Sequence, residues 1–446
     1  MTSDARAEKS PSPPHLQRGV RGDFAKGGTE GFTLGPLNGL RVLELADEKG
    51  QFCGKLMADL GADVIKIEPS GGQNTRSVGP FLNDVPHRER SLSFWHYNTS
   101  KRGVTLNLNT PNGRSLFKRL VPTADIILET YPPGYLPSLG LGYEHLMPLN
   151  PRLIMCSLTP FGQTGPWRDY QTSDLLHLAA GGQMASCGYD PEDVPGAPPI
   201  APGGGNAWHM GAHYAYMAIL AALHYLDMTG EGQYIDASIH EACCLTTEGA
   251  VAIYLSIGEV VSRHTGRHAS PDQSPPIQFA TKEGGWVNVT RSGSNLTPSR
   301  LRKLAEWMDS FGLAEDLLDE KYQSTAVIQE SGHHIARVMQ DFIANMPLEE
   351  VYHGGQQRDY PWGAVRTMDE VMDDPHLQDR DFFTEVEHPE LERSFTYPGP
   401  AAIYNGSPWR ISRRAPLIGE HNVELFCGEL GLSKEELTYL AEAGVI

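Results

Sequence analysis

The sequence predicts an α/β protein built on a parallel β-sheet. Two observations carry this prediction: short runs rich in β-branched residues alternate with helical segments between residues 36 and 160, and a longer apolar helical pattern follows at 207–227. Parallel strands need crossover connections, which helices usually supply. At 446 residues, with 40% hydrophobic and 20% charged side chains, the chain has a globular composition and room for two domains.

The predicted elements follow one another in order along the first half of the chain. The predicted strands are LRVLEL (40–45), ADVIKIE (62–68), VTLNLN (104–109), DIILE (125–129) and RLIMCSLT (152–159). The predicted helices between them are GKLMADLG (54–61) and GRSLFKRLV (113–121). The pattern at 207–227, AWHMGAHYAYMAILAALHYLD, is long enough for a core helix, and the turn MTGEGQ ends it.

The domain boundaries follow from changes in composition. Residues 1–35 are rich in Pro, Gly, Ser and charge without an apolar period, so they are predicted to form a disordered leader ahead of a large domain at 36–225. Residues 226–374 are predicted to hold a linker and a small α/β domain, because a Pro- and Gly-bearing region at 262–286 precedes a strand, WVNVT, and several helices. The C-terminal segment 375–446 is expected to return to the large domain.

Charge and cysteine usage limit the possible partners and location. The formal net charge is −19, from 55 acidic and 36 basic side chains, which opposes non-specific binding to nucleic acid or anionic membranes. The six cysteines form no C-x-x-C pair, which is typical of free thiols in a reducing cytoplasm. The first residues have no apolar signal segment, and YAYMAILAALHYL is too short to span a bilayer. We therefore expect a cytoplasmic protein that binds neither nucleic acid nor membrane.

The usual nucleotide-binding motifs are missing. The turn after the first strand, ADEKGQFCGK, contains Gly50 and Gly54 but not G-x-G-x-x-G, so no NAD site is expected, although Glu68 ends the next strand where a ribose-binding acid could lie. The sequence also lacks G-x-x-x-x-G-K-[ST] and G-x-S-x-G, so it does not indicate nucleotide hydrolysis or a serine hydrolase.

Two histidine pairs are candidates for metal ligands. His264 and His268 are four residues apart but have Gly266 between them and no third ligand nearby, and His333 and His334 are adjacent, which points them apart on a helix. A polar surface or loop role fits both pairs better, so no metal is expected.

One aspartate stands out in the stretch QTSDLLHLAAGG at 171–182. Ser173 or Asp174 is a good N-cap for a helix that begins with Leu175, and this structural role needs no chemistry. The positive end of the same helix would also favour an ionised, nucleophilic Asp174. A cap and a nucleophile therefore share one geometry, and the stretch alone leaves both roles open.

Several segments spread over the chain match the motifs of one family. The opening PLNGLRVLELADEKGQFCGKLMADLGADVIKIEPSGGQNTR has its first strand, helix and second strand, and NTSKRGVTLNL is similar to its N-x-x-K-R-S segment. GLGYEHLMPLNPRLIMCSLTPFGQTGP precedes the position of its catalytic aspartate, TGEGQYIDASIHEA is similar to G-x-G-Q-x-V-D-V-S, and APLIGEHNVEL is similar to P-x-x-G-E-H. From Pro36 nearly to Ile446, the chain resembles the family III CoA-transferases, also called the CaiB/BaiF family.

This resemblance implies a fold and a reaction. It implies a Rossmann-like large domain, a smaller domain, and two ring-shaped chains interlinked as a homodimer. The reaction moves CoA from an acyl-CoA to another carboxylic acid. Asp174, at the position of the family's aspartate, would attack the thioester to give a mixed anhydride and then an aspartyl-CoA thioester, which splits a difficult exchange into easier steps. Backbone N–H groups of Gly181 and Gly182 are candidate donors to the oxyanions.

The resemblance also implies how CoA is held. CoA carries phosphate groups, which an acidic protein must meet with local positive charge. Arg76, Lys101 and Arg102 lie in segments that match CoA-contacting regions of the family, and Gln51 lies where the first strand turns into a helix over the site. Acyl-CoA and a carboxylic acid are the expected substrates, without a metal or NAD.

Departures from the family pattern keep two alternatives open. Gln73 replaces an acid in GGQNTR, and Thr130 and Pro132 replace Asn and Arg in ETYPPG, which allows a CoA-binding protein without catalysis. The family also contains α-methylacyl-CoA racemases, which typically carry His immediately before the matching Asp. Ser173 occupies that place here, which favours transfer, but His145 or His177 could supply the base of a racemase or lyase.

Overall fold

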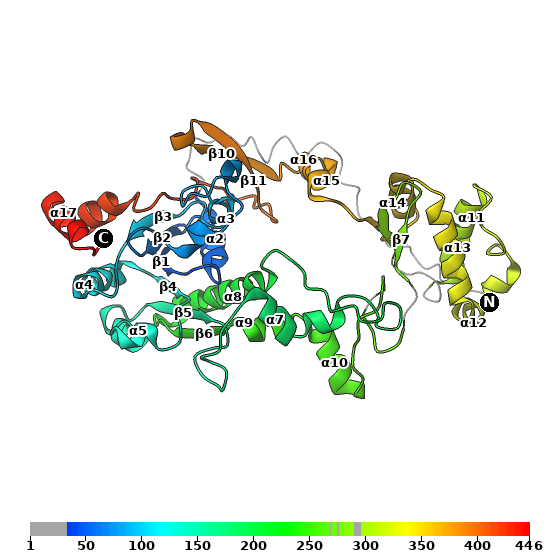
Figure 1. Ribbon diagram of the computed structural model, residues 1–446, viewed down its shortest axis with the longest axis horizontal. Coiled ribbons are helices and arrows are strands. Elements are labelled where there is room, and N and C mark those ends of the chain that lie inside the picture. The colour runs from blue at the N-terminus through cyan, green and yellow to red at the C-terminus, as the bar shows by residue number, and fades with distance from the viewer. Residues whose placement is uncertain (1–33, 268, 274–275, 290–295) are drawn as a thin grey trace, which may run out of the picture.

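The computed structural model describes residues 34–267, 269–273, 276–289 and 296–446 (Figure 1). The predicted leader at 1–35 lies outside the described residues except for its last two.

The centre of the molecule is a six-stranded, all-parallel sheet in the order β3-β2-β1-β4-β5-β6. Its strands are β1 (Arg41–Leu45), β2 (Asp63–Glu68), β3 (Arg102–Thr105), β4 (Ile126–Glu129), β5 (Ile154–Thr159) and β6 (Tyr234–Ser238). The predicted α/β class is confirmed, and all five predicted strands lie in the sheet. The strand predicted at 104–109 is shorter and begins two residues earlier, and β6 adds an edge strand that the hydrophobic pattern did not predict.

Helices cover both faces of this sheet, because the side chains of a strand alternate between its two faces. On one face, α2 (Gln51–Asp59) and α8 (Asn206–Thr229) pack against β1, β4 and β5. On the other face lie α4 (Pro111–Leu120), α17 (Lys434–Glu442) and the helical segment η9 (Val423–Glu429). The last residues of the chain thus pack in the core formed by the first strands. Shorter helices of this unit are α3 (Leu92–Tyr97), α5 (Tyr135–Ser138), α6 (Tyr143–Leu146), α7 (Asp174–Ala180) and α9 (Ile239–Leu245).

A second, smaller unit lies at the other end of the molecule (Figure 1). It contains the antiparallel strands β7 (Gln278–Ala280), β8 (Trp286–Asn288) and β9 (Gly363–Ala364), and the helices α11 (Pro298–Asp309), α12 (Thr325–Glu330), α13 (Gly332–Ala344) and α14 (Leu348–Gln356). Its own core includes Trp307, Phe342 and Trp362. The chain enters by way of α10 (Glu248–Ile257) and returns through α15 (Met368–Met372) and α16 (Pro375–Asp379) (Figure 1).

The returning chain is fastened to the large unit at two places. The hairpin of β10 (Phe383–His388) and β11 (Arg393–Pro398), which was not predicted, packs on Phe94 and Trp95 of α3. Beyond it, the backbone N–H of Gly103 in β3 donates to Nδ1 of His421 at 3.1 Å. The G-E-H motif near the C-terminus therefore holds the end of the chain against an edge strand.

None of the helices in the described ranges is long and apolar enough to cross a bilayer. All six cysteines are free thiols, and three of them, Cys53, Cys156 and Cys243, are buried.

Candidate active site

Asp174 is the first residue of α7, and the start of a second helix holds its carboxylate. Ser173 is the N-cap: its Oγ accepts the N–H of Leu176 at 3.1 Å. Because Ser173 caps the helix, the half-buried carboxylate of Asp174 is not needed as a cap. Its Oδ1 instead accepts a hydrogen bond from the N–H of Ala207 at 2.8 Å. One carboxylate oxygen is thereby fixed, and the local ambiguity of the sequence is resolved because cap and carboxylate are different residues.

Ala207 lies in the first turn of α8, a helix of 24 residues. The N–H groups of a first helical turn have no acceptor within the helix and carry its positive partial charge. The chain enters this helix through Gly205, whose φ of 72° is readily adopted by glycine. The start of α8 thus supplies a backbone donor and a favourable potential for negative charge on Asp174.

A tyrosine–histidine pair lies in the same part of the structure. The hydroxyl of Tyr97 at the end of α3 is 2.7 Å from Nε2 of His209 in α8, and the His209 ring stacks on Phe52 with centroids 4.5 Å apart. Burial lowers the pKa of His209 against the opposing effect of the Asp174 charge. Burial, and then the Asp174 charge, raise the pKa of Tyr97. Both groups are therefore neutral near pH 7. No sequence motif points to this pair, whose members are 112 residues apart.

The two histidines of the racemase alternative lie in different surroundings. His177 is buried, its Nε2 is 2.7 Å from the hydroxyl of Thr172, and burial lowers its pKa to about 4. His145 lies on α6 with a half-exposed side chain that contacts Glu144 at 3.0 Å. Their contacts within the described structure do not join either ring to Asp174.

Gly181 and Gly182 are at the wrong end of α7 to act as oxyanion donors. The N–H of Gly181 donates to the carbonyl of His177 at 2.7 Å, and that of Gly182 donates to Ala179 at 3.4 Å. Both bonds close the C-terminal end of the helix, whereas Asp174 starts it. The prediction for these glycines is wrong, and the backbone donor that the fold brings to Asp174 is Ala207.

A cavity of about 460 Å³ opens at the carboxyl ends of the central strands. From β1 the chain continues outward to β2 and β3 on one side of the sheet, and from β4 it continues outward to β5 and β6 on the other side. The strand order therefore reverses between β1 and β4. Open α/β sheets bind ligands at such a switch point. The cavity is lined by Asp47 and Lys49 after β1, by residues 130–133 after β4, and by Pro160 and residues 168–172 before α7. Its wall ends two residues before Asp174, and its two cations, Lys49 and Arg168, form ion pairs with Asp47 and Asp169 of the same lining.

Thr130 joins the two loops at this switch point. Its hydroxyl accepts the N–H of Asp47 at 3.0 Å and donates to the Asp47 carboxylate at 2.8 Å. The same carboxylate forms a short ion pair with Lys49. Thr130, a departure from the family pattern, therefore holds the loop that carries Lys49, and Pro132 lines the cavity beside it.

Two of the predicted CoA-contacting residues are engaged with carboxylates of this chain. Arg76 is fully buried and pairs with Glu68 at 2.6 Å and Glu89 at 2.7 Å. Arg102 pairs with Asp63 at 2.6 Å and also with two glutamates of η9. Their positions at the β2–β3 side of the sheet make both arginines part of the framework that connects the C-terminal segment to the sheet.

The other two predicted residues are brought together. Gln51 is the first residue of α2, and its backbone carbonyl accepts from Nζ of Lys101 at 2.8 Å. Lys101 is completely buried, and it pairs with Glu44 at 2.7 Å. Burial lowers the pKa of Lys101 to about 8. The buried ammonium group of Lys101 thus stabilises the first turn of α2 through the carbonyl of Gln51.

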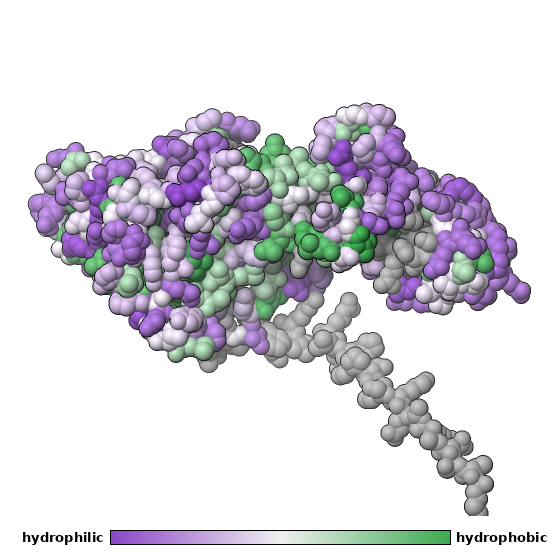
Figure 2. Space-filling model, turned by 90° about the horizontal axis from the view of Figure 1, so that it is seen from below, coloured by the Kyte–Doolittle hydropathy of each residue, from purple (hydrophilic) through white to green (hydrophobic). Residues whose placement is uncertain are grey.

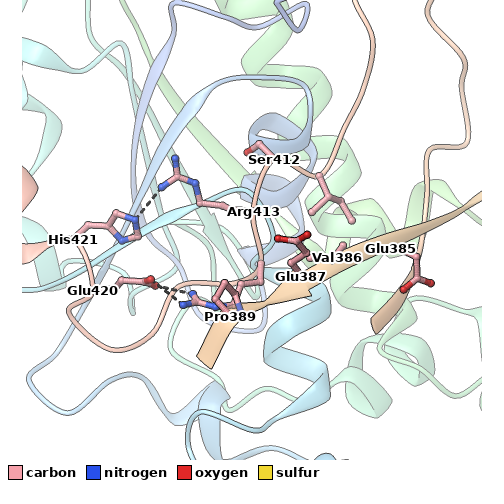
Figure 3. Close-up of a pocket in the computed structure, with 10 residues that line it drawn as sticks. Glu385, Val386, Glu387, Pro389, Ser412, Arg413, Glu420 and His421 are labelled. Carbon is pink, nitrogen blue, oxygen red and sulfur yellow. Dashed lines mark hydrogen bonds and ion pairs between the residues drawn. The ribbon is translucent and has the colours of Figure 1, made fainter. Parts of the chain in front are cut away.

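A larger cavity, of about 540 Å³, lies elsewhere, between β10 and the segment 411–421 (Figure 3). Its lining carries three glutamates together with Arg413 and Arg414, and Arg413 contacts Nε2 of His421 at 2.9 Å. It shares no lining residue with the switch-point cavity. We place the active site at the smaller cavity, because that one adjoins α7 and the carboxyl ends of the strands.

The histidine pairs of the sequence lie outside this site. The ring nitrogens of His264 are held by a carboxylate and a backbone carbonyl of this chain, and its partner in the sequence, His268, is outside the described residues. In the small unit, His334 forms a surface group of possible metal ligands with Glu315 and Asp316, whose ligand atoms lie within 4.8 Å of one another. Lys321 and two arginine nitrogens already neutralise those carboxylates.

Glu129, at the carboxyl end of β4, is predicted to make stability depend on pH. Burial raises its pKa to about 7 from the ordinary 4.5, although Ser157 and the N–H of Tyr131 stabilise the carboxylate. Between these values the folded protein keeps a proton that the unfolded chain releases, so the free energy of unfolding falls as the pH rises through this window. Glu129→Gln is expected to flatten this slope by up to about 1.4 kcal/mol per pH unit in urea titrations from pH 4.5 to 8.

Glu144 provides the control: together with Glu129 it lines a separate cavity of about 260 Å³, but its side chain is 62% exposed. Glu144→Gln should keep the slope of the unaltered protein. An unchanged slope in Glu129→Gln would show that this carboxyl titrates normally.

The fold is a Rossmann-like α/β sheet with a cavity at its switch point, next to the loop that leads to Asp174. The chain belongs to CoA-transferase family III: the model of that family matches residues 37–422. It is therefore a transferase.

Named relatives agree with this membership over nearly the whole chain. Succinyl-CoA–D-citramalate CoA-transferase of Chloroflexus aurantiacus is 33% identical, over 92% of this chain and 98% of that protein. A subunit of succinyl-CoA:(R)-benzylsuccinate CoA-transferase of Thauera aromatica is 32% identical, over 91% and 97%. The crystal structure of a CaiB/BaiF family protein from Brucella suis superposes with a TM-score of 0.75 at 26% identity, covering 89% of this chain and 99% of that one.

Proposed function

We propose that the protein moves CoA from an acyl-CoA to a carboxylic acid through a thioester on Asp174. One observation carries the proposal: the Asp174 carboxylate is fixed through Oδ1 to the start of α8, close to the wall of the switch-point cavity. A carboxylate held in this way is oriented for attack through its other oxygen, Oδ2. Ser173 in the preceding position supports transfer over racemisation.

The exchange would run through two covalent states. Oδ2 of Asp174 attacks the thioester carbonyl, CoA leaves as the thiolate, and a mixed anhydride forms. The thiolate then attacks the Asp174 carbonyl carbon and releases the donor acid. During this second attack the negative charge develops on Oδ1, the oxygen that already accepts from the N–H of Ala207, so the donor is in place before the charge forms. The acceptor acid reverses both steps.

The switch-point cavity is the proposed site of CoA. Its volume lies within the roughly 300–1,000 Å³ of small-molecule sites, and Lys49 and Arg168 would bind phosphates by exchanging them for Asp47 and Asp169. Contacts of CoA with Gln51, Arg76, Lys101 and Arg102 stay a prediction.

The substrates are proposed from the named relatives. The two transferases described above both use succinyl-CoA, and both of their acceptors are dicarboxylic acids. We propose succinyl-CoA as donor and a dicarboxylic acid as acceptor for this chain, acting in the cytoplasm.

A mass-spectrometric screen tests this function. The protein is incubated with succinyl-CoA and a mixed pool of mono- and dicarboxylic acids, and new acyl-CoA products are identified. Addition of hydroxylamine should convert the Asp174 thioester to a hydroxamate in the tryptic peptide. Deuterium from solvent at the α-carbon of an acyl-CoA, without an acceptor acid, would favour the racemase instead. Tight CoA binding without any product would favour the non-catalytic alternative.

A homodimer is also proposed, on the basis of an exposed apolar surface. α8 and α10 carry large apolar side chains that are about half exposed or more, and hydrophobic residues gather in the middle of the face seen in Figure 2. The exposed apolar side chains of these two helices include Met217, Tyr225 and Met228 of α8 and Val251, Tyr254, Leu255 and Ile257 of α10. A surface of this kind on a charged protein is typical of an interface between subunits. Sedimentation equilibrium should give twice the chain mass, and Leu255→Asp should shift the protein toward the monomer.

A further inference from the structure

The first step of the proposed reaction needs a hydrogen-bond donor other than the N–H of Ala207. When Asp174 attacks the thioester, negative charge develops on the carbonyl oxygen of the substrate and not on the aspartate. The N–H of Ala207 is already bonded to Oδ1 of Asp174 at 2.8 Å. A second, separate donor must therefore face the substrate carbonyl, since an unstabilised oxyanion in a partly buried site is costly.

Tyr97 and His209 are placed to supply it. His209 lies two residues beyond Ala207, in the first turns of the same helix, and its Nε2 is 2.7 Å from the hydroxyl of Tyr97. The negative charge of Asp174 acts on both rings: it adds to the effect of burial that raises the pKa of Tyr97, and it opposes the effect of burial that lowers the pKa of His209. The pair is thus electrostatically coupled to the nucleophile, while no hydrogen bond to Asp174 is recorded for it within the described part of the chain.

Packing fixes the orientation of the two rings. His209 stacks on Phe52 with an interplanar angle of 19°, and the Tyr97 ring meets the edge of Phe52 at 82°. Phe52 follows the first residue of α2, so three elements of the fold, α2, α3 and α8, meet at this pair. A donor held by packing needs no reorganisation when the charge forms.

The protonation state decides which group can donate. Both groups are neutral, so one proton lies between the tyrosine oxygen and Nε2 of His209. In the tautomer with hydrogen on Nε2, His209 donates to the tyrosine oxygen, and the hydroxyl hydrogen of Tyr97 is available for another acceptor. In this arrangement His209 orients the hydroxyl of Tyr97 without accepting its proton.

We propose that Tyr97, oriented by His209, donates a hydrogen bond to the oxyanion formed from the acyl-CoA carbonyl during attack by Asp174. Tyr97 is then a catalytic residue and His209 a positioning residue. This inference rests on the proposed transfer function.

The step balances without a proton transfer. An electron pair of Asp174 Oδ2 forms the new C–O bond, and the C=O pair moves to the carbonyl oxygen, which accepts from Tyr97. When the carbonyl re-forms, the C–S bond breaks, and both of its electrons leave with the CoA thiolate. Tyr97 keeps its proton throughout.

The first test removes only the hydroxyl. Tyr97→Phe retains the ring that packs on Phe52, so its fold and KM should stay close to those of the unaltered protein. Its kcat is expected to fall by about 10²- to 10³-fold, the usual effect of losing one oxyanion donor. Steady-state kinetics with succinyl-CoA and the best acceptor acid of the screen would measure both constants, and thermal unfolding would confirm the fold.

The second test separates positioning from packing. His209→Ala should lower kcat as well, whereas His209→Gln, whose amide can still donate toward Tyr97, should recover part of the loss. His213 is the matched control: it lies one turn further along α8 and also packs on Phe52, with centroids 5.2 Å apart, but it is not bonded to Tyr97. His213→Ala should keep the kcat of the unaltered protein.

The possible failures can be told apart. If the unaltered protein gives no acyl exchange and no hydroxamate on Asp174, the transfer function and this inference fall together. If it transfers CoA and Asp174→Asn does not, but Tyr97→Phe keeps full kcat, only the inference falls. Equal losses in His209→Gln, His209→Ala and His213→Ala would also overturn it, because they would indicate damage to helix packing.

Discussion

Replacing Asp174 by Asn is expected to lower the kcat of CoA transfer by at least about 10⁴-fold, as the loss of a covalent nucleophile does in other enzymes. Asparagine keeps the oxygen that accepts from Ala207 at 2.8 Å and the helix start at Ser173, so the fold should remain intact. The amide cannot form the anhydride or the thioester. Acyl transfer from succinyl-CoA, followed by liquid chromatography of the CoA esters, measures the rate, and hydroxylamine should no longer label the peptide that contains residue 174.

Asp169 is the matched control for this substitution. It lies five residues earlier on the same loop, lines the switch-point cavity that ends two residues before Asp174, and has a 75% exposed side chain. Asp169→Asn should transfer CoA at close to the full rate and still be labelled at Asp174. If Asp174→Asn kept the rate of the unaltered protein, the covalent mechanism would be excluded.

Replacing Glu44 by Gln is expected to cost about 3–5 kcal/mol of unfolding free energy, because it leaves buried charges without their partner. Glu44 in β1 is completely buried between two buried lysines, with Lys66 at 2.9 Å and Lys101 at 2.7 Å. Its carboxylate also lies so close to α2 that a Cβ at Gly54 would be 1.6 Å from it. Gly54→Ala should therefore destabilise the protein as well, by displacing the same carboxylate. Urea unfolding at pH 7 measures both variants.

The pH dependence identifies the cause of this loss. Burial lowers the pKa of Lys101 to about 8, while Glu44 raises it. Without Glu44, the pKa of Lys101 in the folded protein falls below 8. The free energy of unfolding of the variant therefore already rises with pH below pH 8, whereas that of the unaltered protein starts to rise only near pH 8. The difference between the two proteins should shrink as the pH rises toward 8. As a control, Glu306, in an exposed pair with Arg302, should change stability by less than about 0.5 kcal/mol when replaced by Gln. A similarly small effect of Glu44→Gln would contradict the prediction.

The sequence was sufficient for the central fold because the hydrophobic pattern of a buried parallel sheet is strong. The strands at 40–45, 62–68, 125–129 and 152–159 are runs of buried side chains, and each was found within two residues of its predicted bounds. β6 escaped the pattern because it is an edge strand whose side chains, such as Tyr234, remain partly exposed. The β10–β11 hairpin was missed because β10 has a single buried aliphatic residue, Val386, between two glutamates, which makes its apolar pattern weak.

The candidate site was only partly readable for a different reason. Asp174 and its cap are contiguous, so the sequence could propose both. The partners of Asp174 come from far along the chain: Ala207 is 33 residues away. Tyr97 and His209 meet only because α3 and α8 pack against α2. Local spacing also could not reveal that Gly181 and Gly182 close the far end of their helix.

The attachment of the C-terminus to β3 has a consequence for how the protein is made. His421 receives the N–H of Gly103 across 318 residues, and Leu425 and Phe426 fill the core against the first strands. At about 5–20 residues per second, a ribosome needs roughly 15 to 60 s to travel that distance. During this interval one face of the sheet has α4 but lacks the cover of η9 and α17, and Arg102 lacks its glutamates from η9. Folding of the large unit is therefore incomplete until residues 421–445 have left the ribosome, and a chaperone can bind the apolar surface that they later cover.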